Sequence, residues 1–79
     1  MTNKFILYGS EGCHLCELAD EICAPIINDA LVHVDIVTDD KLVAQYGVHI
    51  PVLKHMESAS ELFWPFSLEE VEAFVTQWN

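Results

Sequence analysis

The spacing of apolar and polar positions changes several times along the chain, which predicts a succession of short strands and helices. A continuous apolar run at residues 5–8 is typical of a buried strand, and turn residues follow it at 9–12. From Leu15 onward apolar residues recur at helical spacing, and Pro25 is expected to end or kink this helix. Alternating β-branched residues at 31–37 predict a second strand.

The middle of the chain predicts a short helix and two further strands. Residues 38–40 offer an N-cap and Gly47 a stop for a helix of about two turns. Residues 48–53 return to strand character around Pro51, and residues 61–64 predict a last short strand after a polar turn.

The final helix has a well-marked start. Ser67 and Glu70 are spaced as a capping box, in which each side chain bonds the backbone of the other residue. One face of this helix is apolar and consists of Leu68, Val71, Phe74, Val75 and Trp78.

These elements follow the order β-α-β-α-β-β-α over a single domain, residues 1–79. A strand, a helix and a parallel strand, followed by a hairpin and a helix, predict an α/β sandwich with a small mixed four-stranded sheet. If the strand at Pro51 runs antiparallel beside the first strand, its start lies next to the end of that first strand. Pro51 would then face the turn that carries Cys13.

Composition and charge restrict the kinds of partner. Hydrophobic residues make up 52% of the 79 positions, so a compact core is expected in spite of the small size. Three Lys and Arg residues against thirteen acidic ones give a formal net charge of −10, which repels nucleic acid and anionic membranes. A protein partner is therefore expected to be neutral or basic, although acidity also serves simply to keep a small apolar protein in solution.

The cysteine count and the apolar runs predict a cytoplasmic protein. Three cysteines do not make the even framework of a small secreted scaffold, which favours a reducing compartment. The apolar run near the N-terminus is too short for a signal peptide, and no stretch reaches the roughly 18 residues that a transmembrane helix needs.

Cys13-His14-Leu15-Cys16 places two thiols three residues apart where a strand gives way to a helix. Residues i and i+3 share one helix face, close enough for a disulfide after modest adjustment. At a helix start the unpaired backbone N–H groups and the helix dipole stabilise a thiolate, which is the reactive form of cysteine. The pair therefore favours a dithiol redox centre, while metal binding and inert thiols stay open as alternatives.

The two alternatives depend on residues outside the pair. A tetrahedral zinc site usually takes four ligands, and only His14, Cys23 or His33 could complete one in this chain. Cys23 lies about 10 Å from Cys16 along the helix, beyond disulfide reach, and is expected to be a buried apolar filler. His14, when protonated, would favour the Cys13 thiolate; otherwise it is an exposed polar residue of little consequence.

The chain resembles the glutaredoxin-like family of small thioredoxin-fold proteins over nearly its whole length. The matching segments are Leu7-Tyr8 leading into Gly12-Cys13-His14-Leu15-Cys16, then Tyr46-Gly47-Val48-His49-Ile50-Pro51-Val52-Leu53, and Trp64-Pro65-Phe66 before the last helix. The resemblance implies a thioredoxin-like three-layer sandwich and a thiol–disulfide oxidoreductase without a bound cofactor or metal.

The resemblance also implies roles for individual residues. Cys13 would attack a substrate disulfide and Cys16 would resolve the mixed disulfide. Pro51 would follow a cis peptide bond, and the backbone of Ile50 would pair with an extended substrate. Tyr8 before the motif and His14 inside it complete the candidate substrate contacts.

Departures from the family pattern bear on the substrate. Glutaredoxins carry Cys-Pro-Tyr-Cys, a basic residue shortly before it and a Gly-Gly pair before the last helix, and these features hold glutathione. Here the core is Cys-His-Leu-Cys, Glu11 replaces the basic residue, and arginine is absent. Glutathione is therefore not the favoured substrate, and a protein disulfide or another low-molecular-weight disulfide fits as well.

The expected partners are such a disulfide substrate and a reducing partner, with the protein acting as a monomer. Two rival functions stay open. One is a metal or iron–sulfur carrier that uses Cys13, Cys16 and a ligand from a second chain. The other is an interaction module of redox fold whose thiols are vestigial.

Overall fold

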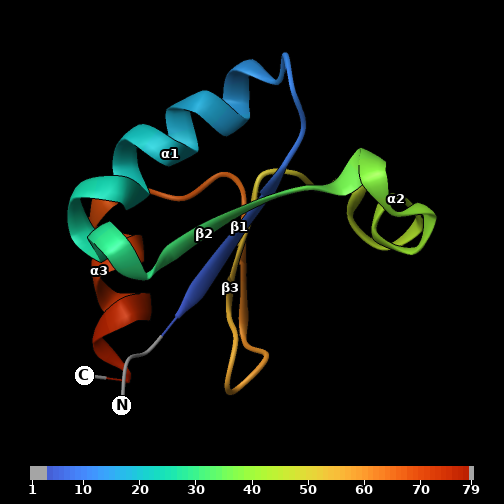
Figure 1. The fold of residues 1–79 in the computed structure, drawn as a ribbon. Coiled ribbons are helices and arrows are strands. Elements are labelled where there is room, and N and C mark those ends of the chain that lie inside the picture. Colours follow the sequence, from blue (N-terminus) through green and yellow to red (C-terminus); the bar gives the residue numbers. More distant parts are fainter. Residues whose placement is uncertain (1–3, 79) are drawn as a thin grey trace.

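A four-stranded mixed sheet forms the centre of the protein in a computed structural model that describes residues 4–78 (Figure 1). The strands are β1 (Phe5–Gly9), β2 (Leu31–Asp35), β3 (Val52–His55) and β4 (Glu61–Phe63), in the spatial order β2-β1-β3-β4. β2 runs parallel to β1, whereas β3 is antiparallel to both β1 and β4. The predicted α/β fold with a small mixed sheet is confirmed.

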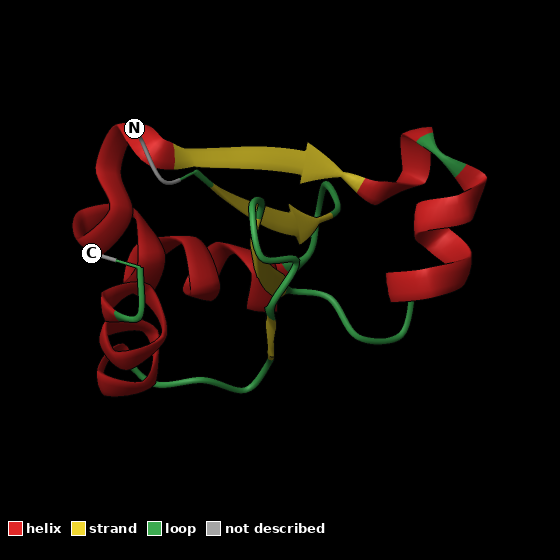
Figure 2. Ribbon diagram, turned by 90° about the horizontal axis from the view of Figure 1, so that it is seen from below, coloured by secondary structure: helices red, strands yellow, loops and turns green. Residues whose placement is uncertain are grey.

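Three helices flank the sheet, and each begins at a side-chain cap. They are α1 (His14–Ile27), α2 (Asp40–Tyr46) and α3 (Leu68–Thr76), with short 3₁₀ turns at η1 (Asn28–Ala30) and η2 (Ile36–Thr38). Asp39 caps α2, and the capping box predicted from Ser67 and Glu70 is present at the start of α3. Figure 2 shows α2 set apart from α1 and α3, at the far end of the sheet.

The two faces of the sheet bury separate cores, because successive strand residues point to opposite sides. Phe5, Leu7 and Leu53 pack with residues of α1 and α3 in the larger core. Tyr8 and Val52, their neighbours along the strands, pack with Tyr46 of α2 and with Ile36 in the smaller core. The predicted three-layer arrangement follows, with α1 and α3 on one side of the sheet and α2 on the other.

Of the two effects expected of Pro25, an end of the first helix is wrong, since α1 continues through Pro25 to Ile27, and a kink stays a prediction. A proline inside a helix removes its own N–H donor and crowds the preceding turn. Pro25 lies close to the end of the helix, which the N–H of Asn28 closes by bonding the carbonyl of Ala24.

Two strands are shorter than the sequence predicts. β2 ends at Asp35, whose carboxylate accepts the N–H of Val37 at 3.0 Å and begins a 3₁₀ turn. β3 begins only at Val52, because a proline has no N–H to give to the ladder. The N–H of Ile50 instead bonds the Tyr46 carbonyl at 3.1 Å, in the loop that follows α2.

None of the helices within residues 4–78 combines the length and the apolar character needed to span a bilayer.

Candidate redox-active site

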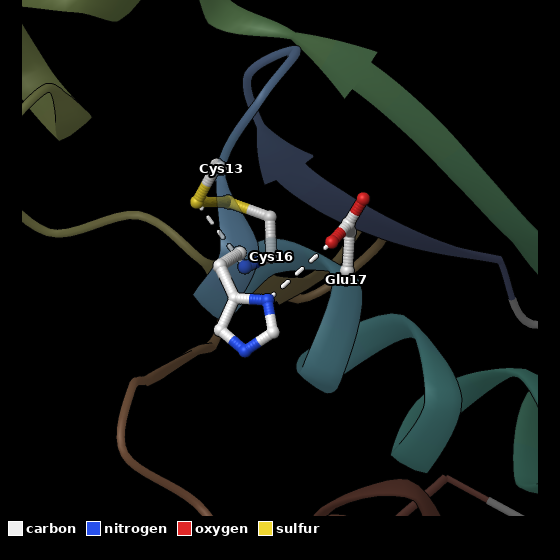
Figure 3. A network of polar contacts seen from close by, with 4 residues as sticks. Cys13, Cys16 and Glu17 are labelled. Atoms are coloured by element: carbon white, nitrogen blue, oxygen red, sulfur yellow. Dashed lines mark hydrogen bonds and ion pairs between the residues drawn. A yellow bond between two sulfur atoms is a disulfide. The ribbon is translucent and has the colours of Figure 1, made fainter.

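Cys13 and Cys16 form a disulfide at the start of α1, with Cα atoms 5.2 Å apart (Figure 3). Cys13 is the N-cap of the helix, and its Sγ accepts a hydrogen bond of 3.1 Å from the backbone N–H of Cys16. This N–H is one of the donors that a helix start leaves without a partner inside the helix. The Cys13 sulfur therefore lies where both a donor and the helix dipole favour negative charge.

The turn before the pair explains how the sulfurs reach this position. Gly12 has a φ of +79°, a conformation that glycine adopts without strain, and the N–H of Cys13 returns to the Ser10 carbonyl at 3.3 Å. A Cβ atom on Gly9 would lie 3.1 Å from the Sγ of Cys16. A side chain on the last residue of β1 would therefore crowd the disulfide.

A cavity of about 330 Å³ adjoins the disulfide, and both Cys13 and Cys16 line it. Its other walls are the end of β1, the first two turns of α1 and the last residues of β2. Both cysteines are half-buried, so the protein packs against part of each residue and leaves the rest open to solvent. A disulfide in such a place can meet another molecule, which one inside a core cannot.

Pro51 lies near this site through the register of the sheet. Tyr8 pairs with Val52 in the antiparallel ladder, which puts Pro51 beside Gly9, the residue on which the disulfide packs. The peptide bond between Ile50 and Pro51 is cis, Pro51 is fully buried and Ile50 is half-buried. The predicted approach of the proline to the cysteine turn agrees with this register.

A family model described as "Glutaredoxin-like domain (DUF836)" matches residues 4–76. The chain belongs to this family. No curated protein matches it, so the family and the solved structures carry the comparison.

Two solved structures of the target protein XcR50 from X. campestris are similar to this glutaredoxin-like chain, both at 34% identity. The X-ray structure has a TM-score of 0.83 and covers 92% of this chain and 96% of its own. The solution structure has a TM-score of 0.82 and covers 94% of each chain. Protein Ne2328 from Nitrosomonas europaea is 26% identical with a TM-score of 0.70, covering 94% of this chain and 92% of its own. These likenesses support the thioredoxin-like fold, and a Cys13–Cys16 pair at disulfide distance in a glutaredoxin-like domain fits a redox role.

None of the four predicted substrate contacts lines the cavity; they are Tyr8, His14, Ile50 and Pro51. Tyr8 is 7% exposed, and its ring stacks on Tyr46 with centroids 4.4 Å apart, so this side chain belongs to the smaller core. His14 is 81% exposed, with its Nδ1 3.6 Å from a carboxylate oxygen of Glu17, and an ion pair so open to solvent contributes little. Contact of either residue with a substrate stays a prediction.

Cys23 lies two turns further along α1 and is fully buried in the larger core. Burial, and then the nearby Asp20 carboxylate, raise the pKa of its thiol to about 12. The thiol is therefore protonated at neutral pH, and the prediction that Cys23 is an apolar filler is confirmed.

Within residues 4–78 no three His, Cys, Asp or Glu side chains gather closely enough to hold a metal ion. His33 and Cys23, considered as additional ligands, do not join the cysteine pair. The Nε2 of His33 lies 2.6 Å from the Oδ1 of Asp20, and Cys23 is enclosed by the core.

Sequence reasoning placed none of Asp20, His33 and Asp35 in a cavity beside the disulfide, and it considered His33 only as a metal ligand. A signal for two of them was present. Asp20 is four residues after Cys16 and so shares its helix face, and Asp35 ends a strand parallel to the one that leads to the cysteine turn. The position of His33 could not be predicted in this way, because the sequence around an exposed histidine on an edge strand does not indicate which helix it contacts.

Proposed function

We propose that the protein is a thiol–disulfide oxidoreductase in which Cys13 is the nucleophile and Cys16 the resolving thiol. The observation that carries this proposal is the disulfide at the N-cap of α1, half-exposed in the wall of a cavity. Protein chains use this arrangement to lower the pKa of a thiol and to present it to a partner.

The hydrogen bond inside the motif supports the assignment of the two roles. The N–H of Cys16 points at the Sγ of Cys13, so after reduction it would stabilise a thiolate on Cys13. Cys16 lies one turn inside the helix and packs against Gly9. A substrate is therefore expected to meet Cys13 first.

The proposed reaction has two exchange steps. The Cys13 thiolate attacks one sulfur of the substrate disulfide, which forms a mixed disulfide and releases the other substrate sulfur as a thiolate. Cys16 then gives up its proton to solvent and attacks the Cys13 sulfur, which releases the second substrate thiolate. Two electrons have passed to the substrate, and an external dithiol restores the pair.

Ile50 and Pro51 are proposed to form the substrate side of the site. The N–H of Ile50 is already bonded to the Tyr46 carbonyl at 3.1 Å, so an extended substrate is expected to pair with the Ile50 carbonyl. Because Pro51 lies beside Gly9, that pairing would hold a substrate sulfur close to the disulfide.

Trapping tests the proposed roles. A Cys16→Ser variant, incubated with bis(2-hydroxyethyl) disulfide, should accumulate a mixed disulfide at Cys13, measured by mass spectrometry of the intact protein and its peptides. Cys23→Ala is the matched control and should turn over without trapping. Full turnover by a Cys13→Ser variant would contradict the assignment of the nucleophile.

A further inference from the structure

The cavity beside the disulfide carries a strong bias of charge. Three carboxylates line it, from Glu17, Asp20 and Asp35, and no lysine does. The chain's lysines lie elsewhere: Lys4 precedes β1, Lys41 is in α2 and Lys54 is in β3. The cavity that both cysteines line is therefore an acidic one.

The carboxylates are placed on two walls that face the same space. Glu17 and Asp20 come from the first two turns of α1, and Figure 3 shows the Glu17 side chain leaving the helix beside the Cys13–Cys16 disulfide. Asp35 comes from the end of β2, on the opposite wall. Asp20 follows Cys16 by one helical turn, a separation of about 5–6 Å between Cβ atoms.

The internal contacts of these groups leave acceptor capacity free for a ligand. Asp35 accepts the N–H of Val37 at its Oδ1 atom, and the Oδ1 of Asp20 lies 2.6 Å from the ring of His33. An oxygen of Glu17 lies 3.6 Å from the Nδ1 of His14. A carboxylate has two oxygens with about four acceptor positions, so none of these groups is saturated. Two imidazoles lie against the three carboxylates, His33 at Asp20 and His14 at Glu17, so the acidic groups outnumber them.

We propose that this site selects disulfides that carry a positively charged group close to the sulfur, and that it disfavours anionic disulfides. The inference rests on the proposed thiol–disulfide exchange and adds the substrate class. The two sulfur atoms define the site, and the carboxylates set the charge of the substrate that it accepts. The Glu17 side chain is 73% exposed and the Asp20 side chain 44% exposed, so the attraction acts largely through solvent and should weaken as salt is added.

Three small disulfides of similar length provide the test. Cystamine is dicationic, bis(2-hydroxyethyl) disulfide is neutral and 3,3′-dithiodipropionate is dianionic. The wild-type protein reduces each disulfide with dithiothreitol as the electron source, and kcat/KM is measured. Each value is divided by the rate at which dithiothreitol alone reduces the same disulfide. We expect cystamine to exceed the neutral disulfide at least tenfold at low salt, and the dianion to fall below the neutral disulfide by a similar factor.

Matched variants separate the cavity from the net charge of the protein. In Glu17→Gln/Asp20→Asn/Asp35→Asn the preference for cystamine over the neutral disulfide should collapse to less than threefold. The control removes three exposed carboxylates away from the cavity, as Asp29→Asn/Glu57→Gln/Glu72→Gln, and should keep most of the preference.

The outcomes distinguish the two proposals. Equal normalised rates for all three disulfides, or a preference that the cavity variant retains, would overturn the charge selection while leaving the exchange activity intact. A loss of the preference in the control variant would assign it to the protein's overall charge and also overturn the role of the cavity. Absence of turnover with every disulfide would overturn the proposed function and this inference together.

Discussion

The first turn of α1 and its middle carry the same chemical group in opposite settings. Cys13 and Cys16 are half-exposed, lie at the helix start and line a cavity, whereas Cys23 is fully buried among the apolar residues of the larger core. The sequence spacing of two cysteines therefore makes a disulfide possible, while the exposure and the neighbours of each sulfur determine whether it reacts.

The same helix serves both settings because its ends and its centre meet different parts of the fold. Ala19, Cys23 and Ile27 recur every four residues and anchor α1 against the sheet and α3. The packing of these three residues fixes the position and direction of α1 relative to the sheet. The N-terminal turn is thereby held over Gly9, and the disulfide lies in position before any substrate arrives.

Alkylation of the reduced protein should show the largest contrast between the two settings. With a pKa of about 12, the Cys23 thiol is ionised only to about one part in 100,000 at pH 7. A thiol at the unperturbed value of about 8.5 is ionised to a few per cent, so Cys13 should react with iodoacetamide at least ~1,000-fold faster. Peptide mapping over time measures both rates. Comparable rates for Cys13 and Cys23 would break the comparison.

The pH dependence of stability should show a smaller effect from the same contrast. The unfolded Cys23 thiol loses its proton near its ordinary pKa of 9.0, whereas the folded one keeps it to about pH 12. The folded state then binds more protons, so its stabilisation is complete below about pH 9 and is lost as pH rises toward 12. The expected slope is about 1.4 kcal/mol per pH unit within that window.

Denaturant unfolding of the oxidised protein between pH 8 and 10.5 measures this loss. Cys13 and Cys16 do not titrate while they are joined, so Cys23 is the cysteine that contributes. The Cys23→Ala variant is the control for lysine and tyrosine groups that titrate in the same range, and its stability should fall less steeply. Parallel curves for the two proteins would show that the thiol is not held in its neutral form.

Much of this contrast could be predicted from the sequence, because it depends on periodicity. The helical spacing that includes Cys23 indicates a buried side chain, and the turn before Cys13 indicates a helix start. The antiparallel pairing that brings Pro51 beside Gly9 entered the sequence reasoning only as a condition, which the register of β1 and β3 meets. Local pattern was sufficient wherever one element determined the position of a residue.

The remaining features arise from tertiary contacts or from competing local bonds. The continuation of α1 past Pro25 depends on how the helix end is closed, and the early end of β2 depends on the carboxylate of Asp35. Tyr8 lies shortly before the motif in sequence, but its side chain points into the smaller core, where its ring stacks on that of Tyr46. The acidic cavity requires α1 and β2 to be set side by side, and no single stretch of sequence shows that.

A redox titration of the cysteines tests the central claim most directly. The protein is equilibrated in thiol–disulfide buffers of known potential, and its free thiols are counted by alkylation and mass spectrometry. We expect one two-electron couple with a midpoint between about −270 and −120 mV, lost in Cys16→Ser and retained in Cys23→Ala. Free Cys13 and Cys16 thiols at every potential up to about −120 mV, or a couple that survives in Cys16→Ser, would contradict it.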